Sequence, residues 1–178
     1  DKLVLTCVDY TSEGLGVVKV EQFPIFVKNM MVGEKAEVII TLVKKSYAFG
    51  HMAKLLTPSP ARITPPCPIA NVCGGCQLQH LNYQEQLNFK QHMVESMMSR
   101  IGKLDVTVHP VMGMDNPFNY RNKVQIPVGT TTGGKMTCGF YRINSNDIVD
   151  METCAIQSNL SNRVYQTTRK LLDQYQLY

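Results

Sequence analysis

The chain lacks any apolar run that approaches the roughly 18 to 20 residues needed to span a bilayer. No apolar stretch follows a basic start, so nothing in the sequence indicates a secretion signal. Since its 178 residues are 44% hydrophobic and only 18% charged, the composition is also not that of a disordered chain. These absences predict a folded cytoplasmic protein of one or two domains with no membrane partner.

Acidic residues are missing from two long stretches, between Glu37 and Glu85 and between Asp115 and Asp147. The two stretches carry these cations: Lys44, Lys45, Lys54, Arg62, Arg121, Lys123, Lys135 and Arg142. Because the whole chain has a net charge of only +4, the remainder is net negative. Cations that no neighbouring carboxylate neutralises favour a polyanionic partner such as RNA. The alternative is chance clustering on a solvated face.

Alternating apolar residues before position 58 predict five short strands. They lie at Leu3–Cys7, Val17–Val20, Ile25–Val27, Ala36–Ile40 and Tyr47–Leu55. Glycines punctuate the series at Gly14, Gly16 and Gly33, and no helical period intervenes, which predicts a small closed barrel over residues 1–57, similar to the oligonucleotide-binding (OB) barrel. Lys44 and Lys45 are then neighbours on a strand, so at most one of them is expected to face a given RNA site.

A proline-rich segment at residues 58–66 is expected to be an extended linker, since proline cannot donate a backbone hydrogen bond. Beyond it, residues 67–178 are predicted to form an α+β domain. Its expected helices run from Asn82 to Gly102, with methionines as core filler, and from about Leu160 to Tyr175. Its expected strands are Leu104–Val108, Val124–Val128 and Lys135–Tyr141.

Three cysteines, Cys67, Cys73 and Cys76, form a C-x5-C-x2-C pattern. In a reducing compartment such thiols indicate metal ligation before disulfides. An iron–sulfur cluster needs four thiolates and accepts three from one loop and one from afar, for which Cys138 and Cys154 are candidates. A zinc site and unrelated buried thiols are the alternatives. Cys7, on an alternating strand, is expected to be a small buried hydrophobe.

Several longer segments follow one another along nearly the whole chain. They are Glu13-Gly14-Leu15-Gly16-Val17-Val18, Cys73-Gly74-Gly75-Cys76-Gln77-Leu78-Gln79-His80, Tyr120-Arg121-Asn122-Lys123, Gly139-Phe140-Tyr141-Arg142, and the approach to Cys154 from Ile148. In this order they resemble the RNA uracil-5-methyltransferase family, the first of them resembling its TRAM domain. The cysteine segment on its own is less specific than the ordered set.

The resemblance implies that Cys67, Cys73, Cys76 and Cys154 hold a [4Fe-4S] cluster and that Cys138 is a bystander. It also implies a TRAM barrel that holds RNA. The residues expected to contact RNA are Lys44, Lys45, Arg62, His80, Arg121, Lys123, Phe140 and Arg142. The parent protein is expected to use S-adenosylmethionine to methylate uracil C5, with ribosomal (23S) RNA as its substrate.

No catalytic residue is expected in this chain. A methyl-donor site normally lies on a glycine-rich turn of a doubly wound sheet, and after Cys154 only about one helix is predicted. The chain alone is therefore expected to be inactive, with a carboxy-terminal methyltransferase domain as its partner. Two alternatives are a zinc-binding RNA adaptor without enzymatic activity and, less favoured, a radical methylthiotransferase relative. The latter family has C-x3-C-x2-C spacing and its barrel after the catalytic domain.

Overall fold

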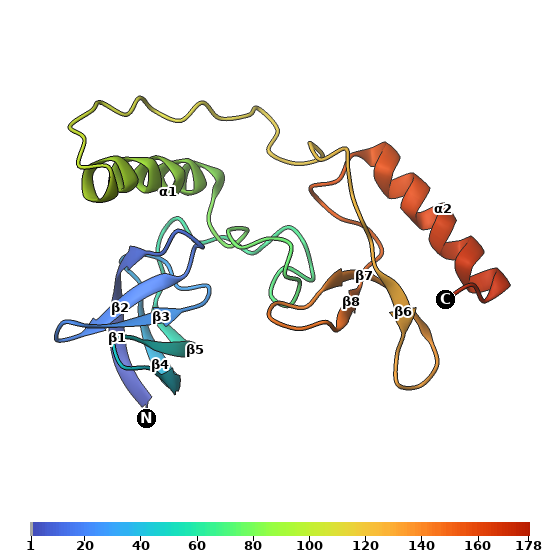
Figure 1. Ribbon diagram of the computed structural model, residues 1–178, viewed down its shortest axis with the longest axis horizontal. Helices are drawn as coiled ribbons and strands as arrows, with labels where there is room; N and C mark the ends of the chain where they lie inside the picture. The colour runs from blue at the N-terminus through green and yellow to red at the C-terminus, as the bar shows by residue number, and fades with distance from the viewer. Residues whose placement is uncertain (1) are drawn as a thin grey trace. The chain divides into compact units, whose positions relative to one another are not determined.

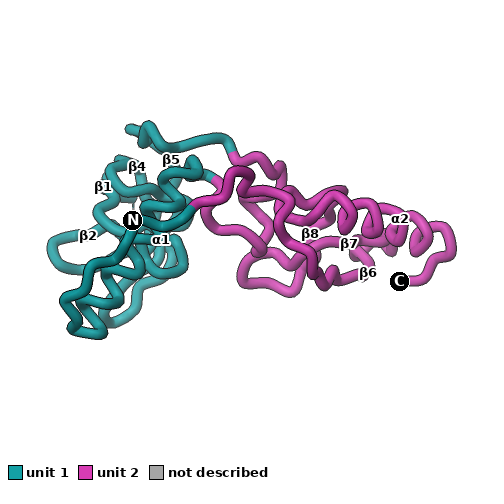
Figure 2. Tube along the Cα trace, turned by 90° about the horizontal axis from the view of Figure 1, so that it is seen from above, with its two compact units in different colours: residues 1–64, 80–112 teal, residues 65–79, 113–178 magenta. Residues whose placement is uncertain are grey.

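The computed structural model describes residues 2–178, which divide into two compact units, coloured teal and magenta in Figure 2. Unit 1 contains the chain up to Thr64 together with His80–Met112. Unit 2 contains Pro65–Gln79 and Gly113–Tyr178. The cysteine loop is therefore separated in sequence from the rest of unit 2 by a helix that belongs to unit 1.

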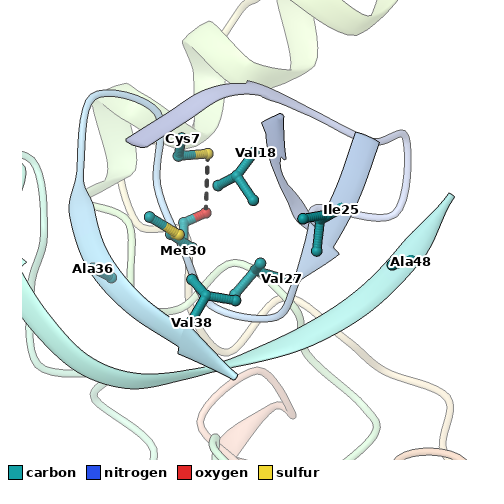
Figure 3. Close-up of a cluster of buried hydrophobic side chains, with 8 residues drawn as sticks. All are labelled: Cys7, Val18, Ile25, Val27, Met30, Ala36, Val38 and Ala48. Carbon is teal, nitrogen blue, oxygen red and sulfur yellow. Dashed lines mark hydrogen bonds between the residues drawn. The ribbon is translucent and has the colours of Figure 1, made fainter. Parts of the chain in front are cut away.

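Five strands close into a barrel in unit 1, as the alternating residues predicted. They are β1 (Lys2–Tyr10), β2 (Gly16–Val20), β3 (Phe23–Val27), β4 (Lys35–Val43) and β5 (Ala48–Thr57), in the closed order β1-β2-β3-β5-β4 (Figure 1). Neighbouring strands are antiparallel except for the parallel pair β3–β5. The inward-facing residues form an apolar core that includes Val18, Ile25, Val38 and Ala48 (Figure 3). The predicted OB-like barrel is thus confirmed.

The predicted helix after Asn82 is also present. The Asn82 side chain caps it by accepting a hydrogen bond from the Glu85 backbone N–H at 2.8 Å. Helix α1 (Tyr83–Ser96) continues into a π-helical turn, η1 (Met97–Ile101), and the turn ends at Gly102. Phe89 is the buried residue of α1, and its ring meets Tyr10 of β1 edge-on at a centroid distance of 5.3 Å.

Two expectations about this region were wrong. Met97 and Met98 are 44% and 38% exposed, so they do not fill a core within residues 2–178. The helix packs through Phe89 and leaves its carboxy-terminal apolar residues outside that contact. Residues 67–178 also do not form one unit, because α1 belongs to unit 1 and the cysteine loop to unit 2.

The proline-rich segment is bound to the barrel rather than extended freely. The Ser59 backbone N–H and the Arg62 side chain both donate hydrogen bonds to Glu34. The Ile63 N–H donates to the His80 carbonyl at 3.0 Å, and the Asn82 N–H to that of Ala61 at 2.8 Å. These bonds fix the segment within unit 1 as far as Ile63.

Unit 2 is an α+β assembly of a three-stranded antiparallel sheet and helix α2 (Asn159–Tyr175). The strands are β6 (Val128–Thr130), β7 (Met136–Tyr141) and β8 (Ile148–Asp150), in that order. Tyr165 of α2 packs on Cys138 and Met151, and its hydroxyl lies 2.9 Å from the Cys138 carbonyl oxygen and 2.6 Å from that of Met151. This contact fixes α2 to the sheet.

The strand at 135–141 and the helix at 160–175 are confirmed, but two other predicted strands are not. Residues 104–108 contain no strand, and the 124–128 segment contributes only Val128 to β6. Leu104 and Val106 are more than half exposed, and a strand needs a partner for its backbone groups. Within residues 2–178, no helix has both the length and the apolar character needed to cross a bilayer.

Candidate functional site

Four cysteines line a single cavity in unit 2. Cys67, Cys73, Cys76 and Cys154 line a cavity of about 20 Å³. The remaining lining is largely apolar, with Ile69, Phe140, Met151 and Ile156, and Arg121 contributes a cation. Cys138 and Cys7 are not among the lining residues, because they lie in the cores of unit 2 and of the barrel.

The cysteine loop is held against the end of β7. The Gly74 backbone N–H donates to the Tyr141 carbonyl at 2.9 Å, and Cys73 forms a bridge with Arg142. A Cβ atom on Gly74 would lie only 3.0 Å from that carbonyl oxygen, so a side chain there would push the loop away. Gly74 therefore permits the close approach that brings Cys73 to the cavity.

Cys154 is held by the first turn of α2. Its backbone N–H donates to the Asn162 side-chain oxygen at 2.9 Å, and the Asn162 amide donates back to the Cys154 carbonyl at 3.0 Å. Ser158 caps the same helix by accepting from the Ser161 N–H at 3.1 Å. The fourth cysteine thus reaches the cavity through a helix start that spacing alone does not reveal.

Hydrogen-bond donors point at the sulfur atoms. The Gly75 N–H lies 3.4 Å from Cys73 Sγ, the backbone N–H groups of Ile69 and Ala70 are directed to Cys67, and the Gln79 side chain is directed to Cys76. Burial raises the pKa of the Cys67 and Cys76 thiols, and these donors oppose that rise. Donors to sulfur stabilise the thiolate form, which is the form that binds metals.

The cysteine side chains do not form a site for a single metal ion. Within the described part of the chain, residues 2–178, no group of three or more His, Cys, Asp or Glu side chains is arranged to hold one metal ion. A four-iron cluster binds each thiolate at a different iron, so its ligands surround a volume instead of meeting at one point. The residues present that could serve such a group are the four thiols, the N–H donors directed at three of their sulfurs and the Arg121 cation.

Some of the predicted RNA contacts are exposed, and others are already paired or packed within the protein. Lys44 and Lys45 lie in the turn after β4, not on a strand, so the argument that they point in opposite directions was wrong. Both are exposed, as are Arg121, Lys123 and Arg142 in unit 2. Arg121 and Lys123 also do not alternate on a strand, since Arg121 forms only an isolated bridge with Gln157.

Three other predicted contacts are placed differently. Arg62 is paired with the buried carboxylate of Glu34, and His80 is 4% exposed within unit 1. Phe140 packs against the core of unit 2 and lines the cysteine cavity. The buried position of His80 conflicts with its predicted RNA contact, and the packing of Arg62 and Phe140 accounts for both residues without RNA.

Sequence reasoning missed two groups of residues. Gln79 and Asn162 support the cysteine site, and neither was predicted to do so, although Gln79 lies within the cysteine segment. Phe26, Tyr47 and Phe49 form an aromatic cluster on the barrel. The alternation predicted for the last strand counted Tyr47 and Phe49 among its apolar positions, whereas in the structure Ala48 points to the core and Phe49 points outward.

Comparison with known proteins identifies the barrel and finds relatives of nearly the whole chain. Residues 6–53 match the TRAM domain. The chain is 49% identical over 168 residues to an uncharacterized RNA methyltransferase of Bacillus cereus, covering 94% of this chain and 36% of that protein. It is 46% identical over 171 residues to one of Listeria innocua, covering 96% and 38%.

A solved structure is also similar. It is the tRNA (uracil-54, C5)-methyltransferase of Pyrococcus abyssi in complex with S-adenosyl-L-homocysteine, with a TM-score of 0.60 and 26% identity, covering 97% of this chain and 37% of that one. The chain therefore spans a little over a third of the length of these relatives. The chain thus contains a TRAM domain and is similar over nearly its whole length to RNA methyltransferases, one of which is named for uracil C5.

Proposed function

We propose that this chain is the RNA-holding portion of a protein that transfers a methyl group from S-adenosylmethionine to C5 of uracil in RNA. The observation that carries the proposal is the TRAM barrel in a chain that matches RNA methyltransferases over 94% or more of its length. The solved relative, named for uracil C5 and bound to the demethylated donor, supports the reaction and the cofactor. The donor pocket and the attacking nucleophile are assigned to the further part of the parent protein.

The exposed cations provide the proposed RNA contacts. Lys44 and Lys45 lie on unit 1, and Arg121, Lys123 and Arg142 lie on unit 2. Cations of this kind bind phosphates and position an RNA without reading its sequence. The proposed substrate is ribosomal (23S) RNA. Since the solved relative is named for tRNA, a competition between the two RNAs is the direct test of that choice.

Salt-dependent RNA binding tests the proposal. The affinity of the chain for RNA should fall steeply with salt, and reversal of Arg121 and Lys123 to Glu should reduce the slope by about 0.7–0.9 for each lost phosphate contact. A matched control reverses Lys90 and Lys170, which are also exposed. An equal change of slope in both double variants would refute a specific role for Arg121 and Lys123. Absence of RNA binding by the unaltered chain would refute the proposed function.

We further infer that Cys67, Cys73, Cys76 and Cys154 hold a [4Fe-4S] cluster. The support is the shared cavity, the N–H donors to three of the sulfurs and the nearby cation of Arg121. When bound, such a cluster supplies a cross-link, and electron transfer where its potential permits. The cross-link would join the cysteine loop to the start of α2. A zinc site in a non-enzymatic RNA adaptor is the alternative, and metal analysis separates the two.

A further inference from the structure

Three aromatic rings contact one another on the wall of the barrel. Phe26 of β3 and Tyr47 of the β4–β5 turn have ring centroids 5.5 Å apart, Phe26 and Phe49 of β5 are 5.8 Å apart, and Tyr47 and Phe49 are 5.5 Å apart. All three residues are half-buried. We call them the aromatic cluster.

The aromatic cluster lies on the outer face of the barrel. Ile25 and Val27, on either side of Phe26, point into the core, as does Ala48 next to Phe49 (Figure 3). Because successive side chains of a strand point to opposite faces, Phe26 and Phe49 point outward. The two residues are partners in the parallel β3–β5 pair, which places their side chains side by side.

These rings do not belong to the core of the barrel. Among the described residues, the apolar side chains that pack on the barrel core come from other positions, such as Leu5, Ile40 and Met52. Leu42, the partner of Phe49 on β4, extends the surface and is 46% exposed. The half-buried rings and the exposed Leu42 together leave apolar surface on the outside of the barrel, and a contiguous apolar surface of this kind marks an interaction site.

Positive charge lies beside the aromatic cluster and favours a polyanionic partner. Lys44 and Lys45 lie in the same turn as Tyr47, which the Lys44 N–H closes by donating to the Tyr47 carbonyl at 2.8 Å. Both lysines are exposed, and neither forms an ion pair with any residue between 2 and 178. The preceding carboxylate, Glu37, is paired with Lys2 at 2.6 Å. Aromatic rings next to unpaired cations suit unpaired nucleotides, whose bases stack while their phosphates meet lysine.

We propose that Phe26, Tyr47 and Phe49 form a stacking surface for unpaired bases of RNA, with Lys44 and Lys45 binding the adjoining phosphates. The inference rests on the proposed function, since it names the feature of RNA that the barrel recognises. Stacking accepts any base, so this surface would hold single-stranded RNA without selecting its sequence.

Fluorescence anisotropy with a labelled oligouridylate and an abasic oligomer of the same length tests the proposal. The unaltered chain should bind the base-containing oligomer more tightly. Tyr47→Leu and Phe49→Leu should each weaken that binding by about 5- to 150-fold, leave the affinity for the abasic oligomer unchanged and leave the salt slope unchanged. Tyr47→Phe, which keeps the ring, should retain the affinity. Replacement of Lys44 and Lys45 by Gln should instead reduce the salt slope.

Tyr175→Leu is the matched control, because Tyr175 is an exposed aromatic residue of α2 and its loss should change neither affinity. Equal binding of both oligomers by the unaltered chain overturns the proposal without any variant. So does an equal loss of affinity for both oligomers in the leucine variants. If the unaltered chain binds structured RNA but not the oligouridylate, the stacking surface is refuted while the proposed function stands. If it binds no RNA, the proposed function is refuted too.

Discussion

Arg62 and Glu34 form a two-pronged ion pair within unit 1. Arg62 Nε donates to Glu34 Oε1 at 2.6 Å, and Nη2 donates to Oε2 at 2.7 Å. Glu34 is fully buried and also accepts from the backbone N–H groups of Met31 and Ser59. Burial would raise the pKa of Glu34, but these hydrogen bonds and the Arg62 charge outweigh it and lower the pKa. The pair fixes the segment after β5 to the barrel.

Replacing Arg62 by Met should therefore destabilise unit 1. The substitution leaves the Glu34 carboxylate buried with one fewer partner, which costs about 3–5 kcal/mol when a buried pair is broken. Urea unfolding at pH 7 should show this loss in the free energy of unfolding. Since the pKa of Glu34 is lowered in the folded state, the contribution of the pair is present above pH 4.5 and is lost as the pH falls through the folded value.

Arg142→Met is the control, because Arg142 is exposed and has no ion pair within residues 2–178. Its stability should stay within about 0.5 kcal/mol of the unaltered chain. Equal unfolding free energies for the two variants would contradict a structural role for the Arg62–Glu34 pair.

His80 should make unit 1 sensitive to mildly acidic pH. Burial, with the Arg62 charge adding to it, lowers the pKa of His80 from 6.5 to about 4. As the pH falls below 6.5, His80 therefore becomes protonated in the unfolded chain but stays neutral in the folded chain. Stability is fully present above pH 6.5 and falls by up to about 3 kcal/mol as the pH drops to 4.

Urea unfolding at intervals between pH 7 and 5 measures this loss, in a range above the titration of Glu34. His80→Leu should remove the slope in this range. His51→Leu should keep it, since His51 is exposed. A slope unchanged by the His80 substitution would assign the pH dependence to another group.

Iron content should depend on Cys154 and not on Cys138. Anaerobically purified protein should be brown and contain about four irons per chain. Cys154→Ser should lose the iron because Cys154 lines the cavity, whereas Cys138→Ser should retain it because Cys138 lies in the core of unit 2. Iron analysis with the absorption spectrum gives the readout. Stoichiometric zinc and no iron after strictly anaerobic work would favour the zinc alternative.

Gly139→Ala should disrupt the sheet of unit 2. An added Cβ would collide with the Val149 carbonyl oxygen of the neighbouring strand β8. Overpacking of this kind costs about 1–3 kcal/mol, which thermal unfolding should detect as a lower midpoint. Gly133→Ala is the matched control, since an added Cβ there meets nothing closer than 3.8 Å. Identical midpoints for the two variants would show that β8 can move away from the added Cβ without loss of stability.

Local patterns in the sequence determined the elements of this protein. The alternation of Leu3, Leu5 and Cys7 recurs in β1, and Asn82 with Glu85 marked the start of α1, because side-chain period and capping depend on neighbours along the chain. The cysteine spacing likewise pointed to one centre. The alternation at Leu104–Val108 wrongly predicted a strand, because no neighbouring strand among the described residues pairs with this segment.

Tertiary structure decided which side chains are available for function. In the sequence Arg62 is one more cation in an acid-free stretch, and only closure of the barrel brings it to Glu34, 28 positions away. Only the parallel β3–β5 pair places Phe26 beside Phe49, and only the start of α2 brings Cys154 to the cysteine loop. Each of these contacts joins residues far apart in the chain. Their meeting depends on how strands pair and pack, which no local pattern encodes.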